Sequence, residues 1–157
     1  MVMLILYNFF LLISIGISLP FIWRKIKPDR EFPYGLKERL AIYERETLEK
    51  LQRKKNIWIH TVSIGEFLSI TPLIKRLKEV NKNNIVITFA TKTGRRVAEK
   101  KFPDIRCLFF PMDLYPVMDR AIFRINPEII VIVETELWPN LLHIASKRKI
   151  PVVLLNG

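Results

Sequence analysis

The stretch that decides the fold is IWIHTVSIGEF, from Ile57 to Phe67. Its first half has the apolar alternation of a buried β-strand, and it ends abruptly in a turn of small residues followed by Glu66. In an α/β sheet, the loop just past the carboxyl end of a strand lies in the crevice where ligands bind, so a glutamate there can act as a general base. The simpler interpretation is that Glu66 lies in the first turn of the next helix, where the helix dipole favours an acid.

From residue 56 onward, strand patterns alternate with helix patterns. We expect strands at 57–62, 85–90, 106–110, 129–133 and 152–155. Helices are expected between them, at 67–80, 95–101, 115–125 and 139–148. This alternation predicts an α/β fold with a doubly wound, parallel, Rossmann-like sheet and right-handed crossovers.

The first 23 residues, Met1 to Trp23, contain no charged side chain. A helix of that length spans a hydrocarbon core of roughly 30 Å. A cleaved signal peptide is disfavoured because no basic residue precedes the run and no small-x-small cleavage site follows it. A buried core helix is the other alternative. We expect a transmembrane anchor at 1–23, in which Asn8, Ser14, Gly16 and Ser18 are tolerated interruptions.

Basic residues crowd the carboxyl side of this run, at positions 24, 25, 27 and 30. The positive-inside rule then predicts a single-pass anchor in the inner (cytoplasmic) membrane, with the folded part facing the cytoplasm. The single cysteine, Cys107, agrees with a reducing compartment and excludes an internal disulfide. We interpret residues 24–55 as a basic connector and a charged juxtamembrane helix from Gly35 to Lys55, followed by the Rossmann-like domain at 56–157.

The net charge is +11, and all of it lies beyond Trp23. Nucleic acid, an anionic membrane surface and a phosphorylated substrate are partners that suit such a charge. The basic residues are scattered and no nucleic-acid-binding module accompanies them, so we do not expect nucleic acid as a partner. With an anchor present, the anionic membrane surface is the simpler partner. A general basic bias without a specific role is the remaining alternative.

In the predicted topology, the carboxyl ends of all strands share one edge of the sheet. We expect that edge to gather, from the first strand to the fifth, Ser63, Gly65 and Glu66, then Thr91, Thr93 and Gly94, then Pro111 and Asp113, then Glu134 and Glu136, and finally Asn156 and Gly157. Two carboxylates with small hydrogen-bonding neighbours suit a site that binds and deprotonates a hydroxyl group.

Several familiar sites are absent from the sequence. There is no GxGxxG and no GxxxxGK[ST], so a bound dinucleotide is unsupported. His60 and His143 are far apart without a second ligand at metal spacing, so we expect no metal. His60 is expected to be a hydrogen-bonded core residue rather than a catalyst. The segment ETELWPN at 134–140 is either a helix-capping arrangement with Trp138 in the core or part of a ligand site.

Four segments, in order and at matching separations, resemble the Kdo transferases, which add 3-deoxy-D-manno-octulosonic acid (Kdo) to the lipid A precursor of lipopolysaccharide. WIHTVSIGE at 58–66 and ETELWPN at 134–140 resemble the family signature. TKTGR at 91–95 resembles its Thr-x-Thr-Gly turn, and FPMD at 110–113 its Pro-x-Asp segment. Upstream, KERL at 37–40 is similar to the family's Glu-Arg-Leu, although Ala41 stands where glycine is usual.

The resemblance implies the amino-terminal, acceptor-binding domain of a GT-B glycosyltransferase, whose carboxy-terminal domain binds the donor CMP-Kdo. It implies that Glu66 is the base that deprotonates the acceptor hydroxyl during inverting transfer, and that Glu134 is a second acidic residue needed for activity. The residues that it implies bind the acceptor or shape the site are Ser63, Gly65, Thr91, Thr93, Gly94, Asp113, Glu136 and Asn140. It implies no cofactor besides the donor substrate.

The sequence stops at Gly157, at the end of a predicted strand and where the family continues. We therefore expect this chain to be the amino-terminal half of a Kdo transferase, with the donor domain missing. On this hypothesis the chain alone transfers no Kdo. The alternative is a catalytically inactive, membrane-tethered remnant or binding domain that lacks the donor half.

Overall fold

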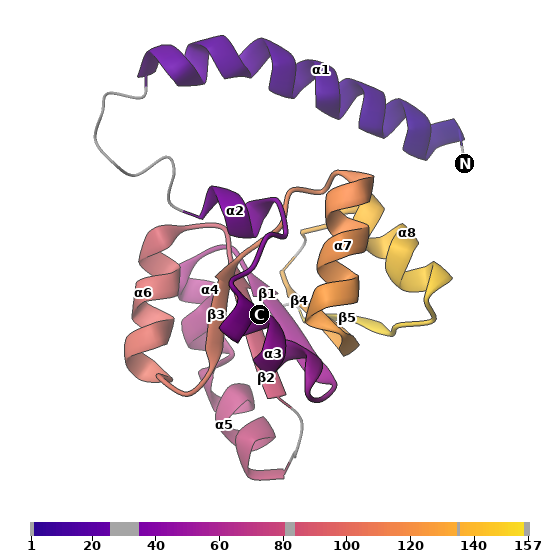
Figure 1. Ribbon diagram of the computed structural model, residues 1–157. Coiled ribbons are helices and arrows are strands. Elements are labelled where there is room, and N and C mark those ends of the chain that lie inside the picture. Colours follow the sequence, from indigo (N-terminus) through magenta and orange to yellow (C-terminus); the bar gives the residue numbers. More distant parts are fainter. Residues whose placement is uncertain (1, 26–34, 81–83, 135, 156–157) are drawn as a thin grey trace.

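The computed structural model describes residues 2–25, 35–80, 84–134 and 136–155. Within them lies a sheet of five parallel strands in the order β3-β2-β1-β4-β5 (Figure 1). The strands are β1 (Asn56–Thr61), β2 (Asn84–Phe89), β3 (Arg106–Phe109), β4 (Pro127–Val133) and β5 (Val152–Leu155). The predicted Rossmann-like sheet is therefore confirmed.

Helices cover both faces of the sheet, because alternate side chains of each strand point to opposite sides. On one face lie α3 (Arg45–Gln52), α7 (Tyr115–Ile125) and α8 (Pro139–Lys147), and on the other α4 (Ile64–Ser69), α5 (Thr71–Val80) and α6 (Lys92–Lys101). Trp58 belongs to the first half of the core and Ile59 to the second, and both are fully buried. The central strand β1 thus supplies both halves of the core.

Two helices that the sequence predicts as continuous are each divided. The helix expected from Gly35 to Lys55 consists of α2 (Leu36–Arg39) and α3, because Ala41 adopts a φ of 55°, a left-handed conformation that a helix cannot continue through. The helix expected at 67–80 is α4 followed by α5. The break lies at Ile70, just before Pro72, which has no N–H to continue the ladder of helical hydrogen bonds.

The amino-terminal segment forms α1 (Val2–Lys25), which crosses one end of the molecule above α2 and α7 in Figure 1. Among the residues that the structure describes, no helix combines the length and apolarity needed to cross a membrane. The predicted basic connector falls largely on residues 26–34, outside the described residues. Asn156 and Gly157, which were expected at the carboxyl edge, also lie outside them.

Glu38 of α2 fastens this segment to the edge strand β3. Its carboxylate Oε2 accepts hydrogen bonds from the backbone N–H of Phe109 and from the Arg95 guanidinium, each at 2.8 Å. The guanidinium groups of Arg39 and Arg95 lie 4.9 and 5.0 Å from the centre of the Phe109 ring. These contacts of α2 and α6 therefore converge on Phe109.

Gly35 begins this segment, and its backbone requires a glycine. Its φ is 82°, and a Cβ added there would lie 2.2 Å from the Phe109 ring. We predict that Gly35→Ala lowers the free energy of unfolding by about 2–4 kcal/mol, measured by urea denaturation, since it adds both backbone strain and overpacking. Gly16→Ala is the control, because a Cβ at Gly16 meets nothing within 4 Å. Equal stability of the Gly35→Ala chain and the wild type would contradict this packing.

Candidate active site

The strand order places the loops after β1 and β4 next to each other. From β1, the chain builds the sheet outward through β2 to β3, and it then returns to add β4 on the opposite side of β1. Ligands of open α/β sheets bind at this kind of switch point, outside the carboxyl ends of the strands. Glu66 follows β1 and Glu134 follows β4. The structure therefore brings the two predicted carboxylate segments to the same point of the sheet edge.

Glu66 is held by the loop that carries it. Its carboxylate accepts hydrogen bonds from the backbone N–H of Val62 at 2.7 Å and of Ser63 at 3.1 Å. The Ser63 hydroxyl in turn accepts the N–H of Glu66 at 3.2 Å, which completes a capping box at the start of α4. The simpler, capping interpretation of Glu66 thus describes its present contacts. Each carboxylate oxygen has a second lone pair, so these contacts do not exhaust its capacity to accept a proton.

Gly65 is a helical residue without a positive φ, and a Cβ added there would meet only the Ser63 hydroxyl, at 3.7 Å. Gly65 is exposed, whereas its neighbour Glu66 is largely buried. The geometry of the turn therefore does not require glycine at this position. Ser63, in contrast, supplies the cap that fixes the start of the helix.

Glu134 has a strained backbone. Its φ is 63°, a left-handed conformation that is uncommon for residues other than glycine. Its N–H donates to the Leu155 carbonyl at 2.7 Å, which ties the end of β4 to β5, while its side chain is exposed. An exposed, strained glutamate at a switch point is a candidate functional residue. Glu136, two residues on, is half-buried.

The predicted residues after β2 form the start of α6. The Thr91 hydroxyl accepts the N–H of Gly94 at 3.2 Å and caps the helix. A Cβ at Gly94 would lie 3.1 Å from both the Phe89 ring and the Thr91 hydroxyl, so glycine allows α6 to pack closely on β2. Thr93 is exposed at the same edge. This turn lies beside β1, on the side away from Glu134.

Asp113 and Asn140 are buried together between the loop after β3 and the start of α8. The Asp113 carboxylate accepts the N–H groups of Asn140 at 3.0 Å and Leu141 at 2.9 Å, and the Asn140 amide donates to the Asp113 carbonyl. Burial raises the pKa of the Asp113 carboxyl, and the donated N–H groups partly oppose that effect. Asp113 and Asn140 therefore link the loop after β3 to the start of α8.

The chain matches the family model of 3-deoxy-D-manno-octulosonic-acid transferases (Kdo transferases) over residues 34–157. The chain belongs to this family. It is 32% identical over 153 residues to a 3-deoxy-D-manno-octulosonic acid transferase of Haemophilus influenzae. The aligned residues make up 96% of the chain and 35% of that relative. It is also 30% identical over 155 residues to a bifunctional glycosyltransferase/methyltransferase of Fusobacterium nucleatum. Here the aligned residues make up 97% of the chain and 23% of that relative.

A third relative, a probable mitochondrial 3-deoxy-D-manno-octulosonic acid transferase of Arabidopsis thaliana, is 37% identical over 103 residues, which are 64% of the chain and 23% of that protein. The chain thus spans about a quarter to a third of the length of these three relatives. Ala41 stands where the sequence resemblance leads us to expect glycine, and its φ of 55° is a conformation that glycine adopts without strain.

His60 lies beneath the carboxyl edge and is fully buried, as the sequence predicts for a core residue. Its ring stacks on Phe110 with centroids 3.8 Å apart, and its Nδ1 lies 3.1 Å from the Thr88 carbonyl. Because a carbonyl only accepts, Nδ1 carries the proton and Nε2 is left as an acceptor. Among the described residues, neither His60 Nε2 nor Trp138 Nε1 has a hydrogen-bond partner. Burial lowers the pKa of His60 to about 4.

Sequence reasoning missed several residues that reach this edge. Arg39 donates to the Ala90 carbonyl at 2.6 Å, just past the end of β2. Tyr7 donates to the Asp113 carboxylate at 3.0 Å, and Asn8 bonds to Asn140. The Kdo transferase motif that contains Arg39 was a signal for the first contact. A tyrosine and an asparagine side by side in an otherwise apolar run were a signal for the others.

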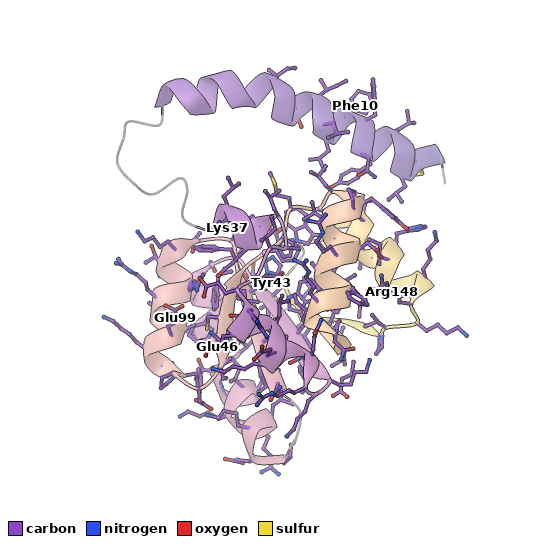
Figure 2. All side chains as sticks on the ribbon, viewed as in Figure 1. Phe10, Lys37, Tyr43, Glu46, Glu99 and Arg148 are labelled. Carbon is purple, nitrogen blue, oxygen red and sulfur yellow. The ribbon has the colours of Figure 1, made fainter. Side chains whose placement is uncertain are left out.

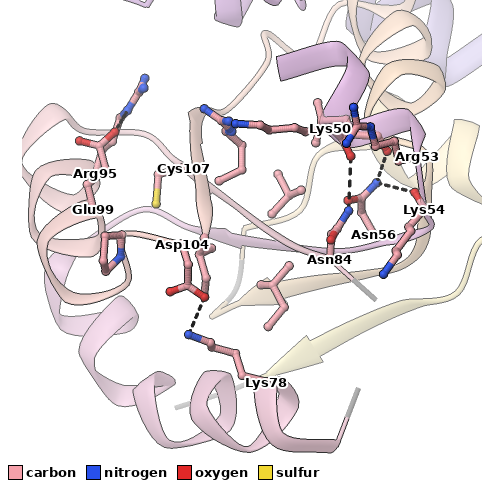
Figure 3. A pocket seen from close by; sticks show the side chains of 16 residues that line it. Lys50, Arg53, Lys54, Asn56, Lys78, Asn84, Arg95, Glu99, Asp104 and Cys107 are labelled. Carbon is pink, nitrogen blue, oxygen red and sulfur yellow. Dashed lines mark hydrogen bonds and ion pairs between the residues drawn. The ribbon is translucent and has the colours of Figure 1, made fainter. Parts of the chain in front are cut away.

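The candidate site does not coincide with the pocket shown in Figure 3, whose volume is about 780 Å³. That pocket runs along β3 and the amino ends of β1 and β2, away from the switch point. Its wall includes Lys50, Arg53 and Lys78, and Lys78 pairs with Asp104 at 2.6 Å. Among the described residues, no group of three or more His, Cys, Asp or Glu side chains is placed to hold a metal ion.

The buried His60 predicts a pH dependence of stability. Its pKa falls from 6.5 in the unfolded chain to about 4 in the fold, so only the unfolded chain is protonated between these values. The stabilising contribution is complete above pH 6.5 and is lost as the pH falls toward 4, by about 3 kcal/mol in total. Urea unfolding should show this loss in the wild type relative to His60→Gln. A difference between the two chains that stays constant over this range would contradict the assignment.

The strained backbone of Glu134 predicts a stability gain on mutation to glycine. Relief of the left-handed strain contributes about 1–2 kcal/mol, and the greater unfolded-chain entropy of glycine offsets about 0.5–1 kcal/mol. Glu134→Gly should therefore raise the free energy of unfolding by up to about 1.5 kcal/mol. Glu134→Ala, which keeps a Cβ, should leave it unchanged. A Glu134→Gly chain that is less stable than the Glu134→Ala chain would show that the backbone at this position is not strained.

Proposed function

We propose that this chain is the acceptor-binding part of a Kdo transferase that moves Kdo from CMP-Kdo to the lipid A precursor. The observation that carries this proposal is the placement of Glu66 and Glu134 after the adjacent strands β1 and β4. Membership of the Kdo transferase family supports the same reaction. The donor site belongs to a carboxy-terminal domain of the whole enzyme.

In this mechanism Glu66 is the general base. The acceptor hydroxyl attacks the anomeric carbon of Kdo with inversion, its proton passes to the Glu66 carboxylate, and the bond to the CMP oxygen breaks so that CMP leaves with the bonding electrons. The two backbone N–H groups that bind the carboxylate fix its position before the acceptor arrives. Glu134 presents a second carboxylate to the same crevice. The role of this chain is therefore to orient the acceptor and to remove one proton.

The proposed acceptor is a lipid, so the site has to operate at a membrane. We propose that α1 attaches the chain to the cytoplasmic face of the inner membrane, where the folded part reaches the lipid headgroups. The net charge of +11 supports attraction to anionic lipid and to the phosphates of the acceptor.

A chimeric enzyme tests the proposed base. In it, this chain replaces the matching region of the Haemophilus influenzae relative, and the release of CMP and the glycosylated acceptor are both measured. We predict that Glu66→Gln lowers kcat by roughly 10²- to 10⁴-fold, the usual contribution of a general base, while the chimera still folds. Glu46→Gln is the matched control, because Glu46 lies exposed on α3 and pairs with Lys50.

Near-normal turnover of the Glu66→Gln chimera would remove Glu66 from the role of base. The isolated 157-residue chain should release no CMP and form no product. A wild-type chimera that folds and binds the nucleotide but transfers nothing would instead support the inactive, membrane-tethered binding domain.

A further inference from the structure

The two sides of α1 differ in what they contact. Leu4, Tyr7, Asn8 and Leu11 are half-buried and recur at the spacing of one helix face. The opposite face carries large apolar side chains that remain exposed, and Phe10 beside that face is 64% exposed (Figure 2). The exposed members of the outer face are Leu6, Phe9, Ile13 and Ile17. The helix is therefore docked on the domain by one face and is uncovered and apolar on the other.

The docked face is held by polar contacts, here named the clasp. Asn8 and Asn140 exchange two amide hydrogen bonds of 2.9 and 3.0 Å, so each side-chain amide both donates and accepts. From the neighbouring position of α1, the Tyr7 hydroxyl donates to the Asp113 carboxylate at 3.0 Å. These partners lie 106 and 132 residues further along the chain. The clasp consists of Tyr7, Asn8, Asp113 and Asn140, and it joins α1 to the carboxyl edge of the sheet.

The clasp cannot coexist with a helix that crosses a bilayer. If Trp23 marked the cytoplasmic interface, Asn8 would lie about 22 Å deeper along the helix axis, at 1.5 Å per residue. That depth lies inside a hydrocarbon core of roughly 30 Å, whereas Asn140 belongs to the folded domain outside it. Either α1 crosses the membrane, or Asn8 pairs with Asn140.

We propose that α1 lies in the plane of the membrane surface, fixed there by the clasp, with its exposed apolar face in the lipid. The partner is a bilayer, because the uncovered face is apolar over the side chains that the structure describes, from Leu6 to Ile17, and two basic residues, Arg24 and Lys25, end the helix. This proposal depends on the proposed function in one respect, because the lipid acceptor is the reason to expect a membrane beside α1. It replaces the transmembrane orientation expected from the sequence.

This arrangement gives the clasp a positioning role. Asp113 and Asn140 also join the loop after β3 to α8, so the same carboxylate and amide connect the membrane helix to the edge that carries the candidate site. The height of that edge above the lipid is then set by contacts within the protein. Tyr7 and Asn8 are positioning residues that act through Asp113 and Asn140.

Cysteine labelling in sealed bacterial spheroplasts tests the orientation of α1. Met3→Cys introduces a thiol near the amino terminus, and the buried Cys107 of the unsubstituted chain gives the background. A membrane-impermeant maleimide is applied first from outside and then after lysis. We expect no external labelling of the Met3→Cys chain, full labelling after lysis, and recovery of the chain in the membrane fraction. External labelling would show a crossing helix and overturn the proposal, and so would recovery in the soluble fraction.

A second substitution tests the clasp itself. Asn8→Leu removes the amide pair and makes α1 more apolar. External labelling of Met3→Cys combined with Asn8→Leu should therefore be at least tenfold greater than that of Met3→Cys alone. Ser14→Leu is the matched control and should remain protected, since the Ser14 hydroxyl bonds to the Leu11 carbonyl within the helix. Equal protection of all three chains would mean that the clasp does not set the orientation. An active chimera with an externally labelled Met3→Cys would refute this inference and leave the proposed function standing.

Discussion

The pairing of β1 with β4 is the constraint on which the candidate site depends. Every residue of β1 is buried, and its backbone bonds to β2 on one side and to β4 on the other. A register slip of one residue would exchange Trp58 and Ile59 between the two faces of the core, so the packing of the core fixes the register. The positions of Glu66 and Glu134 follow from that register, because each lies just past the end of its strand. The two carboxylates are thus brought together by core packing, and neither needs to contact the other.

A second constraint is the buried carboxylate of Asp113. It accepts hydrogen bonds from the start of α8 and from Tyr7, so it joins its own loop to two parts of the chain that are distant in sequence. Removing that carboxylate would leave several buried donors without a partner, which costs more than the loss of an ordinary hydrogen bond. Asp113 therefore couples the order of the carboxyl edge to the placement of α1.

The sequence predicted the sheet well because its strands are short, apolar and separated by clear turn residues. Two of those turn residues, Ser63 and Thr91, cap the helices that follow β1 and β2. It failed where one residue decides the backbone, as at Ala41, where an ordinary side chain hides a left-handed turn. It also failed where the partner is far along the chain. Asn8 looked like a tolerated interruption of an apolar run, and its pairing with Asn140 depends on tertiary contacts that no local pattern contains.

The contact between Glu38 and the N–H of Phe109 also bears on self-association. Unpaired strand edges are templates for aggregation, and at β3 this carboxylate occupies a donor that another strand would need. The opposite edge strand, β5, has no such cover among the described residues, and Val153 and Leu154 are 39% and 47% exposed there. Among the described residues, pairing with another strand is therefore more hindered at β3 than at β5.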